Sequence, residues 1–195
     1  MGRILFGILL GCVLCPVALI FYLKYGDPPL AVNDKPLFHE EDLTQAPMLN
    51  RIPREAPQFS PIQASEENLV AGARIYREQC AVCHGLHGKP ASIGLRMYPI
   101  APPLWEGQRV ADVVGVSGDP VGETYWKVAN GIRLSGMPAY QGVLSDMELW
   151  QVSLLLANAN KPLPPAALSL LKDQAAQPGP QQSERVGRSS NAVTQ

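Results

Sequence analysis

Residues 80–84 read Cys-Ala-Val-Cys-His, and no other segment constrains this chain as strongly. Two thiols at i and i+3 can each add to one vinyl group of the same porphyrin, and the histidine after the second thiol then lies under the iron as a ligand. A zinc site or a bare thioredoxin-like redox pair is the alternative, but zinc needs a second Cys or His pair at ligand spacing. The two remaining cysteines lie in an apolar run far upstream. The pattern therefore predicts one covalently attached haem c, bound through Cys80 and Cys83, with His84 on the iron.

Three landmarks accompany this pattern in order along the chain. Gly72-x-x-x-Tyr76 lies just ahead of the first cysteine, the stretch Gly131–Tyr140 with Gly-Met-Pro at 136–138 follows later, and a terminal helix pattern carries Trp150. With these landmarks, residues 65–160 resemble a class I monohaem cytochrome c. The resemblance covers about half of the chain. It implies a small all-α domain around one haem.

The resemblance also implies that Met137 is the second axial ligand of the iron. The glycine before Met137 and the proline after it form a tight, stiff turn that can hold a thioether at a fixed distance from the metal. Met97, which is followed by Tyr-Pro, is the alternative thioether. His87 is too close to His84 in sequence to reach the opposite face of a haem. We therefore expect a His84/Met137 ligand pair.

The surroundings of the ligands follow from the same comparison. A metal-bound histidine needs its other ring nitrogen held, usually by a carbonyl. In the family a proline-rich loop after the attachment site supplies that carbonyl, and residues 101–104, Ala-Pro-Pro-Leu, are the matching stretch. The resemblance thus implies that Pro102 holds His84. We expect three apolar side chains to exclude water from the haem: Leu104, Trp126 and Ile132.

A filled coordination sphere predicts the function class. With His84 on one side and Met137 on the other, the iron has no open position for a substrate. We therefore expect an electron-transfer protein and not an enzyme, with a comparatively high potential because a thioether favours ferrous iron. Its partners would be redox proteins of a respiratory complex, or a soluble donor or acceptor. Two alternatives are a fixed haem subunit of a larger oxidoreductase complex and a haem sensor or peroxidase-like protein in which Met137 leaves the iron.

Charge narrows the range of partners. The formal net charge of −1 argues against nucleic acid, which usually meets a basic surface. Residues 65–160 carry seven Lys or Arg against nine Asp or Glu, so they offer no strongly basic docking face.

Residues 1–24 carry the second strong signal. The run from Ile4 to Leu23 has no charged residue. At ~1.5 Å per residue, a helix of that length is ~30 Å long, which matches the hydrocarbon core of a bilayer. A cleavable signal peptide has a shorter apolar stretch followed by a small-residue cleavage site. The sequence therefore predicts an uncleaved, single-pass membrane anchor over 1–24. Lipidation at Cys12 and ordinary cleavage are the alternatives.

The anchor holds a second C-x-x-C pattern at 12–15, but proline follows it instead of histidine. We interpret these two cysteines as small apolar side chains in a membrane helix. The charges that flank the span are nearly balanced and do not set its orientation. In the family, haem is attached on the outer side of the membrane. The resemblance therefore implies an inner (cytoplasmic) membrane protein with its haem domain on the periplasmic side.

Prolines mark the segments on either side of the predicted domain. Residues 25–64 carry seven of the 19 prolines and have six Asp or Glu against three Lys or Arg, which predicts an extended Pro-rich linker. As a flexible coil it would span ~35 Å. The alternative is that part of it, at 38–41 or 58–59, packs on the domain as an ordered arm. The composition of residues 161–195 predicts a mostly disordered tail with one short helical turn at 166–172.

Capping signals predict three helices in the domain. Ser65 begins a helix that runs toward Gln79, and Ser145 with Glu148 forms a capping box at the start of the last helix. These two helices are expected to cross at Gly72. A third helix is predicted from Asp119 as N-cap to Asn130. No segment shows a persuasive strand alternation.

Overall fold

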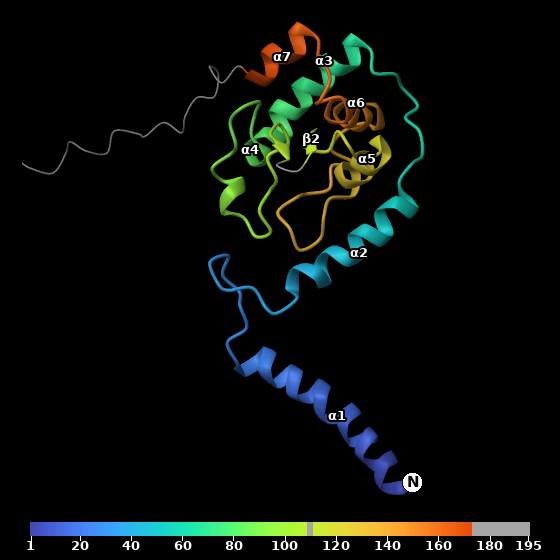
Figure 1. Cartoon of the computed structure of the whole chain (residues 1–195), viewed down its shortest axis with the longest axis vertical. Coiled ribbons are helices and arrows are strands. Elements are labelled where there is room, and N and C mark those ends of the chain that lie inside the picture. Colours follow the sequence, from blue (N-terminus) through green and yellow to red (C-terminus); the bar gives the residue numbers. More distant parts are fainter. Residues whose placement is uncertain (109–110, 173–195) are drawn as a thin grey trace, which may run out of the picture. The chain divides into compact units, whose positions relative to one another are not determined.

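The computed structural model describes residues 1–108 and 111–172 (Figure 1). It divides into two compact units, one that ends at Glu55 and one that begins at Ala56. The first unit holds the helices α1 and α2. The second holds the helices α3 to α7, two short helical turns and one small hairpin.

The helix α1 (Gly2–Tyr25) has 24 residues, so it is about 36 Å long and exceeds the hydrocarbon thickness of a bilayer. None of its residues is buried by other parts of the described protein, as expected for a helix whose side chains would contact lipid. Phe21 and Tyr25 pack with their ring centroids 4.8 Å apart near its C-terminal end. In the part of the chain that the structure describes, α1 is the one helix long and apolar enough to cross a membrane. The predicted N-terminal anchor is confirmed as a helix of that kind.

The linker differs from its prediction, because residues Glu40–Glu55 form a 16-residue helix, α2. Three acidic residues in its first turn complement the helix dipole, and an ion pair between Arg51 and Glu55 (2.7 Å) supports its last turn. Pro47 and Pro53 lie inside this helix. The extended linker that the proline content predicted is therefore wrong for this segment.

The end of the predicted linker belongs to the second unit. Ala56 is buried, and the carbonyl of Pro57 lies so close to Gly122 that a Cβ on that glycine would be 1.7 Å from the oxygen. Phe59, which was the expected packing residue of an ordered arm, is 86% exposed. An ordered arm is therefore present, but it contacts the domain through Ala56 and Pro57.

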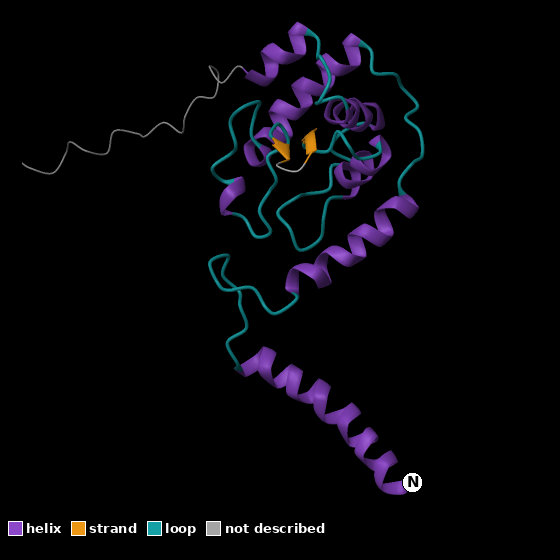
Figure 2. Ribbon diagram, viewed as in Figure 1, coloured by secondary structure: helices purple, strands orange, loops and turns teal. Residues whose placement is uncertain are grey.

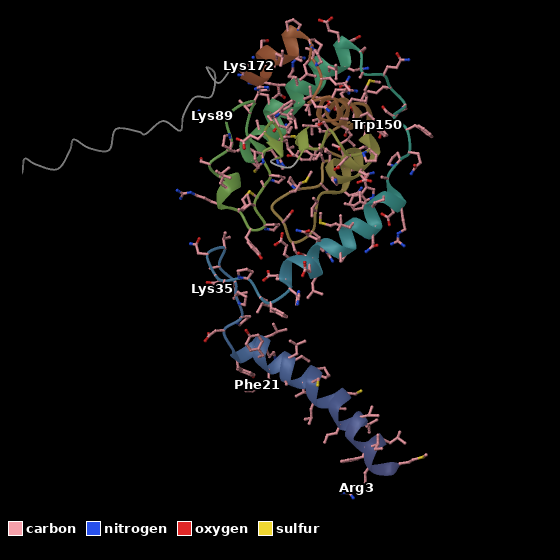
Figure 3. All side chains as sticks on the ribbon, in the orientation of Figure 1. Arg3, Phe21, Lys35, Lys89, Trp150 and Lys172 are labelled. Atoms are coloured by element: carbon pink, nitrogen blue, oxygen red, sulfur yellow. The ribbon has the colours of Figure 1, made fainter. Side chains whose placement is uncertain are left out.

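Two helices cross at the centre of the domain, as predicted (Figure 1). The helix α3 (Glu66–Ile75) begins at Ser65, whose side chain accepts a hydrogen bond from the amide of Asn68. The helix α6 (Asp146–Ala157) begins at the capping box of Ser145. A Cβ at Gly72 would lie 2.3 Å from the carbonyl oxygen of Gln151, so the crossing requires glycine at this position. Figure 3 marks Trp150 on α6; this side chain is buried.

The predicted third helix is α5 (Val121–Asn130), and it ends at Gly131 with φ +65° as expected. Its start differs by one residue, because Pro120 occupies the N-cap position. Asp119 does not cap the helix. Its carboxylate forms an ion pair with the ammonium of Lys127 at 2.8 Å. This ion pair connects the residue before α5 to the last turn of the helix.

A short antiparallel hairpin of β1 (Gly107–Gln108) and β2 (Ala111–Val114) was not predicted (Figure 2). Its strands are shorter than the window over which alternation is visible in a sequence. The domain is otherwise helical, so the all-α prediction is confirmed with this small addition.

The core extends past the predicted end of the domain. The helix α7 (Pro165–Lys172) packs against α3, and its Ala167 and Leu171 are fully buried. The short helical turn expected at 166–172 is therefore a core element, and the domain ends no earlier than Lys172. The tail predicted beyond it lies outside the described residues.

Candidate haem-attachment site

The attachment pattern lies where one helix changes its winding. After α3, residues Tyr76–Cys80 form a π-helical turn, η1, and α4 (Ala81–His84) follows at once. The amide of Ala81 bonds to the carbonyl of Tyr76, five residues back. Turns of this π type are rare in proteins, and those that occur are often found at functional sites. Both thiols of the pattern, Cys80 and Cys83, are free and half-buried.

Two tyrosines hold the two ends of this segment. The hydroxyl of Tyr76 donates to the carbonyl of Gly85 at 2.8 Å, directly after His84. The hydroxyl of Tyr140 donates to the carbonyl of Gln79 at 2.9 Å, directly before the first cysteine. Tyr76 is fully buried, and burial raises its pKa well above the usual range, so its hydroxyl remains a donor. The attachment segment is thus fixed on both sides.

The imidazole of His84 is oriented by the predicted partner. Its Nδ1 lies 2.8 Å from the carbonyl oxygen of Pro102. A carbonyl oxygen can only accept, so Nδ1 carries the proton and Nε2 keeps its lone pair. Burial lowers the pKa of His84, and the bond to Pro102 offsets part of that effect. A neutral ring with a free Nε2 is the form that binds a metal.

The environment of Cys80 argues against a redox-active dithiol. Burial, and then the charge of the neighbouring Cys83, raise the pKa of the Cys80 thiol to about 12. Redox-active C-x-x-C pairs have a lowered thiol pKa instead. Among the described residues, no group of three or more His, Cys, Asp or Glu side chains is placed to hold a metal ion.

The loop that carries Met137 is closed by its own hydrogen bonds. The hydroxyl of Ser135 accepts from the amide of Met137 at 3.1 Å and donates to the carbonyl of Ile132 at 2.7 Å. The amide of Ile132 in turn donates to the carbonyl of Met137 at 3.2 Å. The side chain of Met137 is half-buried and packs against the core. The tight turn that the glycine and proline predicted is present.

The alternative thioether lies against the same loop. A Cβ at Gly136 would be 1.8 Å from the Cε of Met97, so the methyl group of Met97 rests on the glycine next to Met137. The segment that holds Met97 also contacts the attachment site, because a Cβ at Gly94 would lie 1.9 Å from the carbonyl of Cys83. Both candidate sulfurs are therefore in this region of the domain, and Met137 as the ligand stays a prediction.

Of the three residues expected to exclude water from the haem, Leu104 forms a hydrogen bond with the attachment segment. Leu104 is buried, and its amide donates to the carbonyl of His84 at 3.4 Å. Trp126 and Ile132 are half-buried, and their approach to a haem stays a prediction. Sequence reasoning missed Trp105, which is buried and packs edge-on against Tyr76 with ring centroids 5.3 Å apart. It follows Leu104 directly, so its place after the proline-rich loop was the available signal.

The donor set fits haem c. Two free thiols three residues apart can form the two thioether bonds, Nε2 of His84 is available for the iron, and a second soft donor lies in the Met137 loop.

Residues 67–154 match the family described as cytochrome C oxidase, cbb3-type, subunit III. No curated protein and no solved structure matches the chain.

Proposed function

We propose that this chain, whose residues 67–154 form a cytochrome c domain behind an N-terminal anchor helix, is a membrane-tethered monohaem electron carrier that passes single electrons to or from a respiratory complex. Haem c supplies the one-electron chemistry. The protein supplies attachment, axial ligands and a dry environment.

One observation carries this proposal above the others. The bond from Tyr140 to the carbonyl of Gln79 brings the Met137 loop to the residue that precedes the first cysteine. This arrangement would let His84 and Met137 both hold the iron of a bound haem. The iron would then have no open position for a substrate, which favours electron exchange as the function.

Each residue has a defined task in this account. Cys80 and Cys83 hold the group covalently, so that it is retained through repeated redox cycles. Pro102 holds the ring of His84 and makes Nε2 a better donor. The buried side chain of Leu104 excludes water beside His84, and low exposure raises the potential because water stabilises the more charged ferric state.

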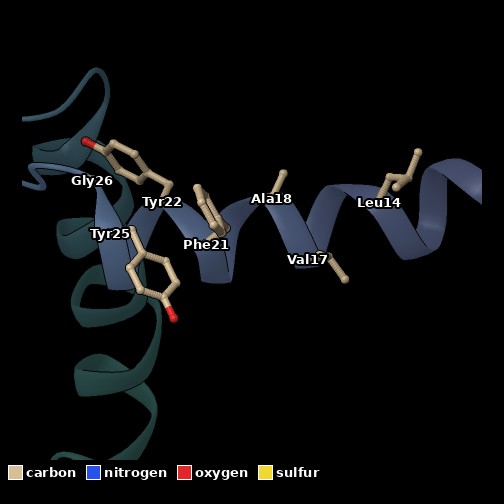
Figure 4. A pocket seen from close by; sticks show the side chains of 7 residues that line it. All are labelled: Leu14, Val17, Ala18, Phe21, Tyr22, Tyr25 and Gly26. Carbon is tan, nitrogen blue, oxygen red and sulfur yellow. The ribbon is translucent and has the colours of Figure 1, made fainter.

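The anchor determines where the carrier works. We place α1 in the inner (cytoplasmic) membrane as a single span, with the haem domain on the periplasmic side. Tyr22 and Tyr25 lie at the end of α1 that leads to the domain, where aromatic side chains prefer the membrane–water interface. A shallow hollow lies along this end of α1 and is lined by mostly apolar residues: Leu14, Val17, Ala18, Phe21, Tyr22, Tyr25 and the following Gly26 (Figure 4). Because they lie on the span, lipid is their expected neighbour.

A second candidate function is a fixed haem subunit of an oxidase complex. The description of the matching family, a subunit of a cbb3-type cytochrome c oxidase, favours it. The two candidates differ in whether the chain stays with other subunits. Full-length protein isolated in mild detergent should run alone if it is a carrier, and with stoichiometric partners if it is a fixed subunit.

Haem attachment is tested by a pair of matched double variants. Cys80→Ser/Cys83→Ser should abolish haem that survives denaturing electrophoresis and acid–acetone extraction. Cys12→Ser/Cys15→Ser removes the same number of thiols from the other C-x-x-C pattern and should leave covalent haem unchanged. Haem released intact from the unaltered protein would overturn the proposed function.

A further inference from the structure

The methionine loop is connected to the attachment segment by the side chain of Tyr140. The hydroxyl of Tyr140 donates to the carbonyl of Gln79 at 2.9 Å, across 61 positions of the chain. Tyr140 follows Met137 by three residues, and Gln79 lies in η1 next to Cys80. The bond therefore joins the two segments that would hold a haem from opposite directions.

Apart from the bonds within the loop itself, further hydrogen bonds attach its two ends to α5. At its start, Gly131 donates from its amide to the carbonyl of Lys127 and caps the helix. At its end, the amides of Tyr140 and Gln141 donate to the carbonyls of Val128 and Ala129 at 3.1 and 3.0 Å. These bonds fix where the loop begins and ends, but they do not determine how closely it approaches the attachment segment. The Tyr140 hydroxyl, by contrast, bonds directly to the attachment segment.

The surroundings of Tyr140 favour a lasting bond. Its side chain is half-buried and packs against the core, so the ring has little freedom to leave. Burial is the main cause that raises its pKa, which keeps the hydroxyl protonated and able to donate. The acceptor carbonyl is a backbone group in a short helical turn, so its position is fixed by the chain.

We propose that Tyr140 is a positioning residue for Met137, whose hydroxyl holds the methionine loop closed on the attachment segment and so keeps the thioether on the iron. This inference rests on the proposed function, because it assigns Met137 to the iron. It adds a residue that acts through the loop and does not itself touch the haem.

Tyr140→Phe isolates the hydroxyl, because phenylalanine keeps the ring and its packing. Tyr125→Phe is the matched control: it also removes a tyrosyl hydrogen bond of this domain, the one that the hydroxyl makes to the carboxylate of Asp146 at the start of α6. That bond lies outside the methionine loop. A purely structural role of Tyr140 would give the two variants similar behaviour.

The test measures the ligand directly in haem-loaded, full-length protein. The readouts are the far-red sulfur-to-iron absorption band of the ferric form, the rate of carbon monoxide binding to the ferrous form, and thermal unfolding. Losing one hydrogen bond should shift the equilibrium between the closed and open loop by about 3- to 10-fold. Tyr140→Phe should therefore bind carbon monoxide about 3- to 10-fold faster and lose the band at a lower temperature than the protein unfolds. Tyr125→Phe should match the unaltered protein in both ligand readouts.

Two different failures are distinguishable. If the unaltered protein shows the band but Tyr140→Phe keeps its strength and the original carbon monoxide rate, the role of Tyr140 is wrong and the carrier function stands. The same holds if Tyr140→Phe lowers only the unfolding temperature. If the unaltered protein has no band and binds carbon monoxide rapidly, Met137 is not the ligand, and both proposals fall.

Discussion

The crossing of α3 and α6 makes a quantitative prediction for Gly72→Ala. The added Cβ would lie 2.3 Å from the carbonyl oxygen of Gln151 and 3.1 Å from the Cβ of Leu155, where ordinary contacts begin at 3.4 Å. The first of these contacts is to backbone, so the helices must separate by about 1 Å. Overpacking costs about 1–3 kcal/mol, and a clash with backbone lies in the upper part of that range, about 2–3 kcal/mol. Alanine returns about 1 kcal/mol through its higher helix propensity.

The net loss for Gly72→Ala is therefore about 1–2 kcal/mol, which corresponds to a drop in Tm of about 4–16 °C for a domain of this size. Thermal unfolding followed by far-ultraviolet circular dichroism measures it. Arg74→Ala is the control, since this residue is exposed on the same helix and its substitution should change stability by less than about 0.5 kcal/mol. An unchanged or raised Tm for Gly72→Ala would show that α3 and α6 do not approach each other this closely.

Three further predictions follow from the packing and capping of the domain. Deleting the chain from Pro164 onward should destabilise the domain strongly because it removes the buried Ala167 and Leu171, and equal stability of the deleted and full chains would contradict this. Limited proteolysis, in contrast, should remove the predicted tail from about Gln174 without changing the haem spectrum. A soluble fragment that starts at Ala56 should be more stable to urea than one that starts at Ser65, because the shorter one lacks the contact of Pro57 with Gly122, and equal midpoints would count against that contact. The hydrogen bonds from Ser145 lower the pKa of Glu148 below 4.5, so the stability they contribute is present above pH 4.5 and is lost as the pH falls through the lowered pKa. The difference in unfolding free energy between the unaltered protein and Ser145→Ala should therefore shrink over that acid range, and a difference independent of pH would refute this.

Local signals predicted the parts of this protein that depend on neighbouring residues. The capping box at Ser145, the cap at Ser65 and the close approach at Gly72 are all present, since each depends on a few residues of one helix and on the absence of a side chain. The contact between His84 and Pro102 was also expected, but only because the family resemblance supplied it.

Other features depend on contacts that a pattern does not contain. Tyr140 bonds to a backbone carbonyl 61 positions away, and no spacing rule relates the two. The core role of α7 depends on how its short apolar stripe meets α3, which composition alone made look like the start of a disordered tail. The helix α2 contains Pro47 and Pro53, and an acidic first turn and a local hydrogen bond from Thr44 to the carbonyl of Glu40 support it.

The ligands of the iron are the most direct test of the whole account. Ferric protein with Met137→Ala should lose the far-red sulfur-to-iron band, and its ferrous form should bind carbon monoxide readily, because the sixth position is then open. Met97→Ala, which removes the other thioether beside the same loop, should keep the band and the slow binding of the unaltered protein. A band that disappears in Met97→Ala instead, or rapid carbon monoxide binding by the unaltered protein, would contradict a His84/Met137 electron carrier.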